Sequence, residues 1–300
     1  MGVQVEPDSA PDATPCASPA ELSPGPGDVV KRHRLSTRLW HWTNVVTLAV
    51  MMMSGLMIFN AHPRLYWGQY GANPDYAWLE IGSTENTGFV TVGPLRIETT
   101  GVLGRYTGAD GNVQRHAFPG WITIPSRYSL ADARLWHLAF AWVLALNLTL
   151  YMFISLRNRH FRGDLAISRD EARPSHVWQD IKEHAQLKFP TGAAALKYNI
   201  LQKLAYSSVL FVMLPLMILT GLTLSPAMGA GWGWLLDIFG GRQSARSIHF
   251  ITMIALIGFF FVHMAMVVLA GPINELRSML SGYYKLPGKT AEPAIEELPQ

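Results

Sequence analysis

Four long apolar stretches, separated by polar segments, dominate the hydrophobic pattern of this 300-residue chain. Each stretch is close in length to the roughly 20 apolar residues that cross the hydrocarbon core of a bilayer as a helix. The pattern therefore predicts an all-α membrane protein, a four-helix transmembrane bundle whose spans lie at about 39–59, 135–156, 204–225 and 248–270. Pro215 lies within the third span, where membrane helices tolerate a kink.

The polar segments set the expected domain limits. Residues 1–30 contain no apolar run and are rich in Pro, Ala, Asp and Glu, which predicts a disordered tail. We expect the four-helix domain at 31–282 and a C-terminal tail at 283–300. The connection 60–134 is a long insertion between the first and second spans, and residues 89–97 within it predict a β-hairpin. The insertion is either a packed cover over the bundle or a docking surface.

Lys and Arg are distributed unevenly, and this asymmetry predicts the orientation. The N-terminal segment has four up to residue 38, segment 157–203 has nine, and the tail after residue 270 has three. The connections 60–134 and 226–247 have six and two, the six being spread over a much longer segment. We therefore expect a multi-pass protein of the bacterial inner membrane, with both termini cytoplasmic and the long insertion periplasmic.

Composition and motifs exclude several classes of protein. A single cysteine, Cys16, excludes a disulfide framework and any Cys-ligated zinc site or iron–sulfur cluster. There is no C-x-x-C-H for covalent haem, no Walker loop, no Rossmann glycine pattern and no nucleophile motif. We therefore expect no catalytic residue in this chain. Membrane lipid is an expected partner, and nucleic acid is not.

Four histidines interrupt the spans, and the predicted topology sorts them by depth: His137 with His249 near the outer surface, and His41 with His263 near the cytoplasm. His249 and His263 are 14 residues apart, about 21 Å along one helix and nearly on one face. Ionisable groups at membrane depth usually mark function, and histidine is the commonest metal ligand. Two imidazoles that face each other can supply both axial ligands of a haem iron, so we expect two such centres. The alternative for His249 and His263 is that both are hydrogen-bonded to neighbouring helices, and His62 is a rival outer ligand.

Other residues near the two expected centres are candidate contacts. Gly55 lies 14 residues after the first histidine of the spans, level with the outer centre. It either leaves room for a porphyrin or is an ordinary small-residue packing contact. Haem propionates need cations at the membrane surfaces, and the candidates are Arg134 and Arg246 outside, and Arg38 and Lys203 inside. Each of these four is alternatively an ordinary interfacial residue.

Several phrases resemble a known family. Residues 38–42 read R-L-W-H-W, a single histidine opens the second span, and two histidines lie 14 apart in the fourth. This pattern resembles the four-helix dihaem b-type cytochromes, the membrane subunits of respiratory formate dehydrogenase and nickel–iron hydrogenase. The phrases F-N-A-H-P-R-L-Y-W-G at 59–68 and G-G-R-Q-S-A-R-S-I-H-F at 240–250 are most similar to thiosulfate reductase cytochrome b subunits. The resemblance covers roughly 35–282.

The resemblance implies two non-covalent haem b groups with bis-histidine ligation and exchange of electrons with quinone. In the formate dehydrogenase subunit, a Tyr-Asn-x-Gly-Gln-Lys stretch before the third span lines the quinone pocket. The matching stretch here is 198–203, in which Asn199 and Gln202 match and Leu201 replaces the glycine. That replacement removes the expected glycine contact. The two amides are alternatively ordinary helix caps.

The expected function is that of a membrane dihaem cytochrome b that passes electrons between the quinone pool and a periplasmic oxidoreductase subunit. The family's neighbours imply a molybdopterin enzyme as that partner, with substrate chemistry on the other chain. Alternatives are a stand-alone haem enzyme, such as a quinone-linked superoxide oxidase or a metal-ion reductase, and a transporter without a cofactor. The direction of electron flow stays open. The expected docking face comprises 60–134 and 227–241, with anchors at Trp67, Trp78, Trp121, Trp232 and Trp234.

Overall fold

The computed structural model describes most of the chain between residues 27 and 286. The described residues are 27–158, 161, 165–168, 171, 173–186, 199–225, 227 and 231–286. The tails predicted at 1–30 and 283–300 therefore lie largely outside the described residues, as do Tyr198 and part of the proposed docking segment 227–241.

Four long helical segments are each long and apolar enough to cross a membrane. They are α1 (Leu35–Phe59), α2 (Leu130–Arg157), a third formed by α4 (Ile200–Ser208), η4 (Val209–Met213) and α5 (Leu214–Leu224), and α8 (Arg242–Ala270). This confirms the mostly helical prediction with four spans. Each segment begins several residues before its predicted start, because polar residues complete the first turn. At α2, for example, the side chain of Ser129 accepts a hydrogen bond from the Asp132 amide.

The third span contains an irregular turn at the predicted proline position. Pro215 lies in the first turn of α5, and the preceding segment η4 is a π-helix. Proline has no amide hydrogen to donate to the carbonyl one turn earlier, so the regular α-helical ladder is interrupted there. A π-turn inside an α-helix is one of the recognised ways to absorb such an interruption.

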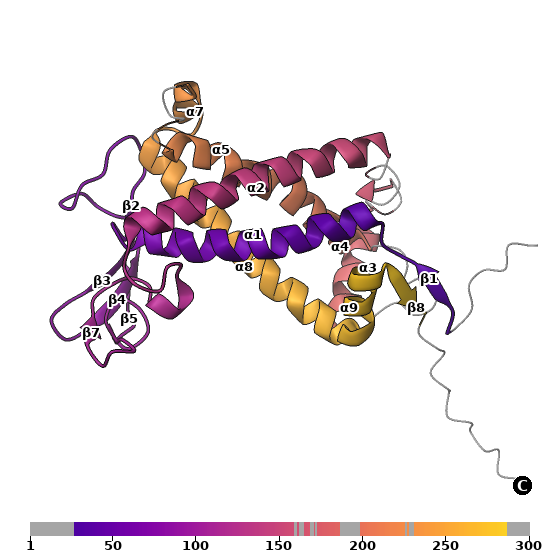
Figure 1. The fold of residues 1–300 in the computed structure, drawn as a ribbon, viewed down its shortest axis with the longest axis horizontal. Helices are drawn as coiled ribbons and strands as arrows, with labels where there is room; N and C mark the ends of the chain where they lie inside the picture. Colours follow the sequence, from indigo (N-terminus) through magenta and orange to yellow (C-terminus); the bar gives the residue numbers. More distant parts are fainter. Residues whose placement is uncertain are drawn as a thin grey trace, which may run out of the picture.

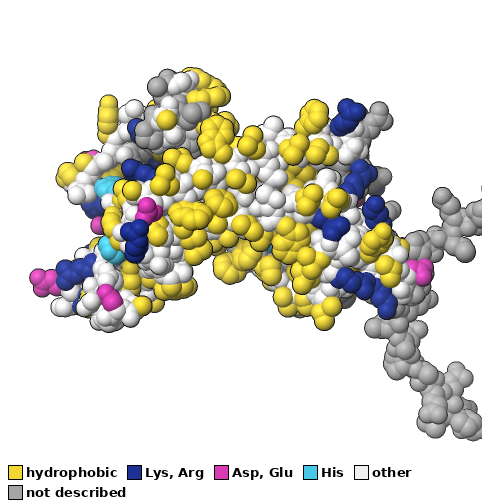
Figure 2. Space-filling view, viewed as in Figure 1, with side chains coloured by type: hydrophobic (Ala, Val, Ile, Leu, Met, Phe, Trp, Pro, Cys, Tyr) yellow, Lys and Arg dark blue, Asp and Glu magenta, His cyan; other side chains and the backbone are white. Residues whose placement is uncertain are grey.

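The long helices run lengthwise through the molecule, and the small elements gather at its two ends (Figure 1). Figure 2 shows hydrophobic side chains spread over the middle of the visible face, with Lys and Arg concentrated at the end that carries α9 and β1. The opposite end mixes basic, acidic and histidine side chains. An apolar middle with polar ends is the surface that a bilayer requires.

The segment between α1 and α2 forms an antiparallel sheet at one end of the bundle. Its strand order is β2-β3-β4-β5, with two further short strands and one short helix beside it. The bounds are β2 Arg64–Leu65, β3 Leu79–Ser83, β4 Gly88–Val92, β5 Leu95–Glu98, β6 Tyr106–Thr107, β7 Val113–Gln114 and η1 Gly120–Ile122. The predicted hairpin at 89–97 is confirmed, because β4 and β5 pair from Phe89 with Glu98 to Val92 with Leu95.

The opposite end ties the two ends of the described chain together. Strand β1 (Val29–Lys31) pairs antiparallel with β8 (Tyr283–Lys285), and helix α9 (Pro272–Ser281) lies between α8 and β8. Residues 29–30 and 283–285, just outside the predicted domain limits 31 and 282, thus take part in this strand pair. Neither segment has a strand pattern of its own. Each forms a strand because its backbone N–H and C=O groups are hydrogen-bonded to those of the other segment.

The remaining helices and the main core complete the fold. Helix α3 (Pro174–Ala185) lies near the start of α4, and α7 (Gly233–Ile238) precedes α8. The main buried core lies in the middle of the bundle and comprises Met51, Leu144, Leu148, Tyr151, Leu210 and Leu214. Met51 lies between His41 and Gly55 on α1, so this core fills the level between the two predicted centres.

Candidate functional site

The structure brings the four span histidines together as two pairs. The ring centroids of His137 on α2 and His249 on α8 are 6.3 Å apart. Those of His41 on α1 and His263 on α8 are 6.4 Å apart. The pairing is the one that depth sorting predicts. We call His137/His249 the outer pair, at the end with the β2–β5 sheet, and His41/His263 the inner pair.

The distance between the two ring centroids of each pair indicates what can lie between the rings. With a metal–nitrogen bond of about 2 Å and an imidazole radius of about 1 Å, two imidazoles that share one metal have centroids about 6 Å apart. Both observed separations match that value. A direct imidazole–imidazole hydrogen bond or a stacked pair would bring the rings closer. The spacing therefore fits one metal atom between the two rings of each pair.

The two pairs offer few other protein ligands. Among the described residues, no group of three His, Cys, Asp or Glu side chains converges as a metal site. A centre with only two protein ligands suits a metal whose remaining ligands come from a macrocycle, as in a haem with two axial histidines. The donor set and the spacing thus fit haem better than a bare metal ion.

In the outer pair, the neighbouring helices hold the Nδ1 atom of each ring. The Nδ1 atom of His137 lies 3.1 Å from the Met51 carbonyl oxygen and 3.1 Å from the Ser54 hydroxyl. The Nδ1 atom of His249 lies 2.8 Å from the hydroxyl of Thr220. Ligand histidines in metal sites usually bond their second ring nitrogen in this way.

The inner pair has a different environment, made of aromatic rings. The ring of His263 stacks on Phe259 at 5.8 Å with an interplanar angle of 13°, and Trp42 meets His41 edge-on at 5.3 Å. In the described part of the chain, the buried Nδ1 atom of His41 has no hydrogen-bond partner. The buried side-chain amide of Asn44, one turn further along α1, has none either.

Three of the four predicted cations lie within one turn of a span histidine. Arg246 precedes His249 on α8, hydrogen-bonds to the His62 carbonyl and lies over the ring of Phe59. Arg134 is exposed one turn before His137 on α2. On α1, Arg38 precedes His41 by one turn and donates from Nε to the Met279 carbonyl oxygen.

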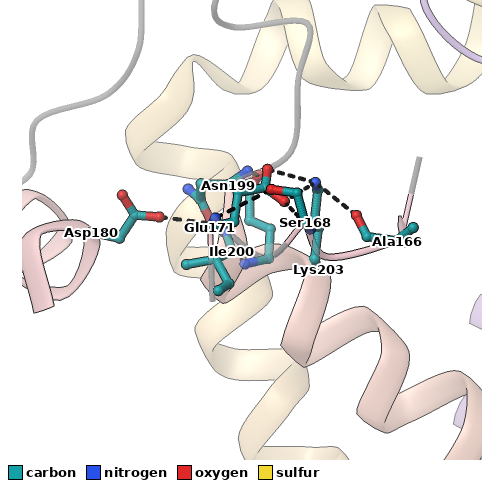
Figure 3. Close-up of polar contacts among 8 residues, drawn as sticks. Ala166, Ser168, Glu171, Asp180, Asn199, Ile200 and Lys203 are labelled. Carbon is teal, nitrogen blue, oxygen red and sulfur yellow. Dashed lines mark hydrogen bonds and ion pairs between the residues drawn. The ribbon is translucent and has the colours of Figure 1, made fainter. Parts of the chain in front are cut away.

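The fourth cation, Lys203, already has an acidic partner. Its ammonium lies 2.8 Å from the Glu171 carboxylate and also bonds to the Ala166 carbonyl (Figure 3). Hydrogen bonds from Lys203 and from the Ser168 amide lower the pKa of Glu171 from 4.5 to about 2. A haem propionate would have to compete with the Glu171 carboxylate for Lys203. The sequence alone does not indicate this ion pair.

The two amides of the predicted quinone stretch form a capping box at the start of α4. The Asn199 side-chain oxygen accepts from the Gln202 amide, and the Gln202 side-chain oxygen accepts from the Asn199 amide. Such reciprocal bonds satisfy two otherwise unpaired donors at a helix start. The capping interpretation is therefore confirmed. Each cap uses the side-chain oxygen, so donation to a quinone carbonyl would come from the amide nitrogens.

Gly55 lies against one of the histidine rings. A Cβ atom built on Gly55 would come within 3.3 Å of Cε1 of His137, so the missing side chain makes room for the imidazole itself. Gly221 on α5 has the equivalent place beside His249, at 3.6 Å. Sequence reasoning missed Gly221, Ser54 and Thr220. The signal was a hydroxyl residue followed by Gly and Leu, which occurs in both the first and third spans.

The rival ligand His62 has a partner in its own segment. Its Nε2 atom lies 3.2 Å from the Tyr66 hydroxyl, and the two rings stack at 5.7 Å. Burial, together with the nearby Arg246 and Arg64, lowers the pKa of His62. The neutral ring is thus favoured, and its position is fixed by Tyr66 and not by a second histidine.

The predicted tryptophan anchors divide into two kinds. Trp121, Trp67 and Trp234 are exposed, Trp121 by 79%. Trp78 instead donates from Nε1 to the Ser247 hydroxyl and stacks on Trp67. Because Ser247 lies two residues before His249 on α8, Trp78 fastens the sheet to the helix that carries one histidine of each pair.

Similarity to known proteins agrees with this geometry. The family model of prokaryotic cytochrome b561 matches residues 32–282. A relative from Azospira oryzae, with the provisional name protein-methionine-sulfoxide reductase subunit YedZ1, is 27% identical over 249 residues, covering 82% of this chain and 93% of the relative. These matches confirm the expected cytochrome b membrane subunit with haem b. Four apolar helices and two histidine pairs are thus found in a chain that belongs to the prokaryotic cytochrome b561 family.

Proposed function

We propose that this chain binds two non-covalent b haems and passes electrons between the quinone pool and a periplasmic oxidoreductase subunit. His137 and His249 bind the outer haem iron, and His41 and His263 bind the inner one. The observation that supports this most strongly is the meeting of four span histidines as two pairs with metal-sharing separations. Bound haem would supply one-electron redox chemistry, while the chain holds it and keeps water away.

The cations beside the histidines complete the two haem sites. Arg246 and Arg134 lie one turn before the outer histidines, towards the sheet end, and Arg38 lies one turn before His41, towards the opposite end. Propionates are anionic and stay near the polar surface, so these three guanidinium groups are their proposed partners. Lys203 can join them only by leaving Glu171, and it is the weakest candidate of the four.

The quinone site is proposed at the inner end, beside the start of α4. Tyr206 lies edge-on to Phe259, which stacks on His263, so these rings connect α4 to the inner pair. Gln202 precedes Tyr206 by one turn on the same face. Because the side-chain oxygens of Asn199 and Gln202 cap α4, we propose their amide nitrogens as the donors to a quinone carbonyl.

We propose that the sheet end is periplasmic and docks the partner. The dense Lys and Arg segments are at the opposite end, which the positive-inside rule assigns to the cytoplasm. Exposed aromatic residues gather at the sheet end, and Tyr70, Tyr76 and Trp121 are the most exposed of them. Tryptophan and tyrosine are enriched among interface residues that dominate binding.

The partner is proposed to be a molybdopterin oxidoreductase subunit that carries the substrate chemistry. The family resemblance points to that class, and the name of the Azospira oryzae relative points to a protein-methionine-sulfoxide reductase. With a reductase as partner, quinol oxidation at the inner end would supply its electrons.

Purification in mild detergent tests the core of this proposal. A pyridine haemochrome assay on the wild-type chain should find two b haems per chain, and a second subunit should co-purify. One haem or none per chain would refute the dihaem assignment. Two haems, with no second subunit and with either rapid haem reduction by superoxide or rapid haem oxidation by a metal ion, would favour the stand-alone enzyme instead.

The docking face has a matched pair of variants. Trp121→Ala removes an exposed tryptophan at the sheet end, whereas Trp178→Ala removes one on α3 at the opposite end. Only Trp121→Ala should weaken co-purification of the partner, and neither should change the haem content. A partner lost with Trp178→Ala alone would reverse the proposed orientation.

A further inference from the structure

A hydroxyl–glycine dipeptide stands against each outer histidine. Ser54-Gly55 on α1 faces His137 of α2, and Thr220-Gly221 on α5 faces His249 of α8. Two different helix pairs thus present the same two-residue arrangement to the same kind of ring. In each case the hydroxyl contacts Nδ1 and the glycine lies beside Cε1.

The hydroxyl groups act as acceptors from the rings. The Ser54 hydroxyl donates to the Val50 carbonyl at 2.7 Å, and the Thr220 hydroxyl donates to the Leu216 carbonyl at 2.6 Å. A hydroxyl has one hydrogen, so each oxygen can only accept from the histidine it contacts. The Met51 carbonyl near His137 can also only accept. This hydrogen-bond pattern assigns the proton of both rings to Nδ1, which leaves the lone pair on Nε2.

The glycines make this approach possible. A Cβ atom at Gly55 would lie 3.3 Å from Cε1 of His137, a tighter contact than ordinary packing, and one at Gly221 would lie 3.6 Å from Cε1 of His249. A larger side chain would push the ring away from the hydroxyl that precedes the glycine. Glycine inside a helix lowers helix stability relative to alanine, so its use beside His137, where a Cβ would press on the ring, requires a reason.

We propose that Ser54-Gly55 and Thr220-Gly221 are positioning elements that fix the tautomer of the outer axial histidines and set the reduction potential of the outer haem. An imidazole that donates from Nδ1 is a more basic ligand. A more basic ligand stabilises the oxidised iron, which has the higher positive charge, and so lowers the potential. The inner pair lacks this device at His41, whose Nδ1 has no hydrogen-bond partner in the described residues. This inference depends on the proposed haem ligation.

The test compares two buried threonines, Thr220 on α5 and Thr252 on α8. Thr220→Val removes the hydroxyl that contacts His249, whereas Thr220→Ser keeps it. Thr252→Val is the control, because Thr252 is also buried and its hydroxyl bonds only to its own helix, at the Ile248 carbonyl. Redox titration of the purified haem-loaded protein, with low-temperature EPR of the oxidised form, gives the readout.

We expect Thr220→Val to raise one of the two midpoint potentials and to shift one low-spin EPR signal, with the other haem unchanged. Ser54→Ala should act in the same direction and less strongly, because its contact is longer and the Met51 carbonyl still accepts from His137. Thr220→Ser and Thr252→Val should match the wild type. Selective loss of one haem in Thr220→Val, with full retention in Thr220→Ser, would also support the inference.

The inference is overturned if Thr220→Val has wild-type potentials and EPR signals, or if Thr252→Val shifts a haem as far. It is also overturned if Thr220→Ser behaves like Thr220→Val, since the hydroxyl would then not be the determinant. Failure of the proposed function is distinguishable, because it would show in the haem count of the wild-type chain before any hydroxyl is changed.

Discussion

The outer and inner histidine pairs have nearly equal ring separations but are held by different physical means. Hydrogen bonds between Nδ1 and groups on α1 and α5 hold both outer rings, and a glycine lies beside each ring. The inner rings are positioned by aromatic contacts with Trp42 and Phe259, and Nδ1 of His41 has no partner among the described residues. The same kind of side chain is thus held by directional bonds at one end of the bundle and by packing at the other.

This contrast shows how one bundle can hold two similar histidine pairs whose rings differ in hydrogen bonding. Hydrogen bonds to Nδ1 set the orientation and basicity of a ligand, whereas stacking restricts the ring without changing its basicity to the same degree. We therefore expect the outer site to be preorganised by the polypeptide. The inner site should depend more on its cofactor for its final geometry.

The largest expected effect comes from removing one ligand at a time. His249→Ala and His137→Ala should each abolish low-spin haem at the outer site, and His41→Ala and His263→Ala should do so at the inner site. Because the two pairs share no residue, the second haem should remain in each variant. The pyridine haemochrome assay and EPR measure this. Loss of both haems in all four variants would mean that the two sites are not independent.

The glycines give the next largest effect. Gly55→Ala should displace His137 and convert the outer haem to a high-spin form, whereas Gly221→Ala should be tolerated, because its new Cβ has an ordinary contact distance. Alanine also raises helix propensity by about 1 kcal/mol, so a lost haem could not be ascribed to a weaker helix. Equal effects of Gly55→Ala and Gly221→Ala on the haem spin state would contradict the expectation that only Gly55→Ala displaces a ring.

We expect quinol to react at the inner end of the molecule, so variants at the start of α4 should slow haem reduction by quinol. Asn199→Asp and Gln202→Glu keep the side-chain oxygens that cap α4 but remove the amide nitrogens. If those nitrogens bind a quinone carbonyl, each variant should weaken quinol binding about tenfold, since a hydrogen bond of about 1.5 kcal/mol corresponds to that factor. Stopped-flow haem reduction by a quinol analogue is the measurement. Unchanged kinetics in both variants would exclude this site.

The smallest effect concerns Glu171 and Lys203 at the inner end. The pKa of Glu171 is lowered in the fold, so the pair stabilises the fold above about pH 4.5 and loses that contribution as the pH falls towards 2. Glu171→Gln should lower stability by less than about 1 kcal/mol, because the pair is partly exposed. Thermal unfolding at pH 7 tests this, with the outer haem spectrum expected to stay unchanged.

Most of the bundle could be predicted from the sequence, because span length and histidine depth depend on position along the chain alone. Which side chain meets Nδ1 of His249 could not, since that depends on how α5 is rotated against α8. Lys203 was predicted beside a haem propionate, but its partner Glu171 lies in a segment with no predicted structure. The pairing of β1 with β8 joins residues from the two ends of the described sequence. A local sequence pattern cannot predict a contact between residues so far apart in the chain.

That terminal pairing affects the order in which the two sites can be completed during synthesis. His41 is among the first span residues to be made, but Arg38 and Trp42 bond to the carbonyl of Met279, and Arg32 pairs with Glu275. Both partners follow the last span. The outer site needs nothing beyond α8, whereas the start of α1 is secured only when α9 and β8 have left the ribosome. Chain ends that pair with each other thus make the His41/His263 end of the bundle the last part of the protein to mature.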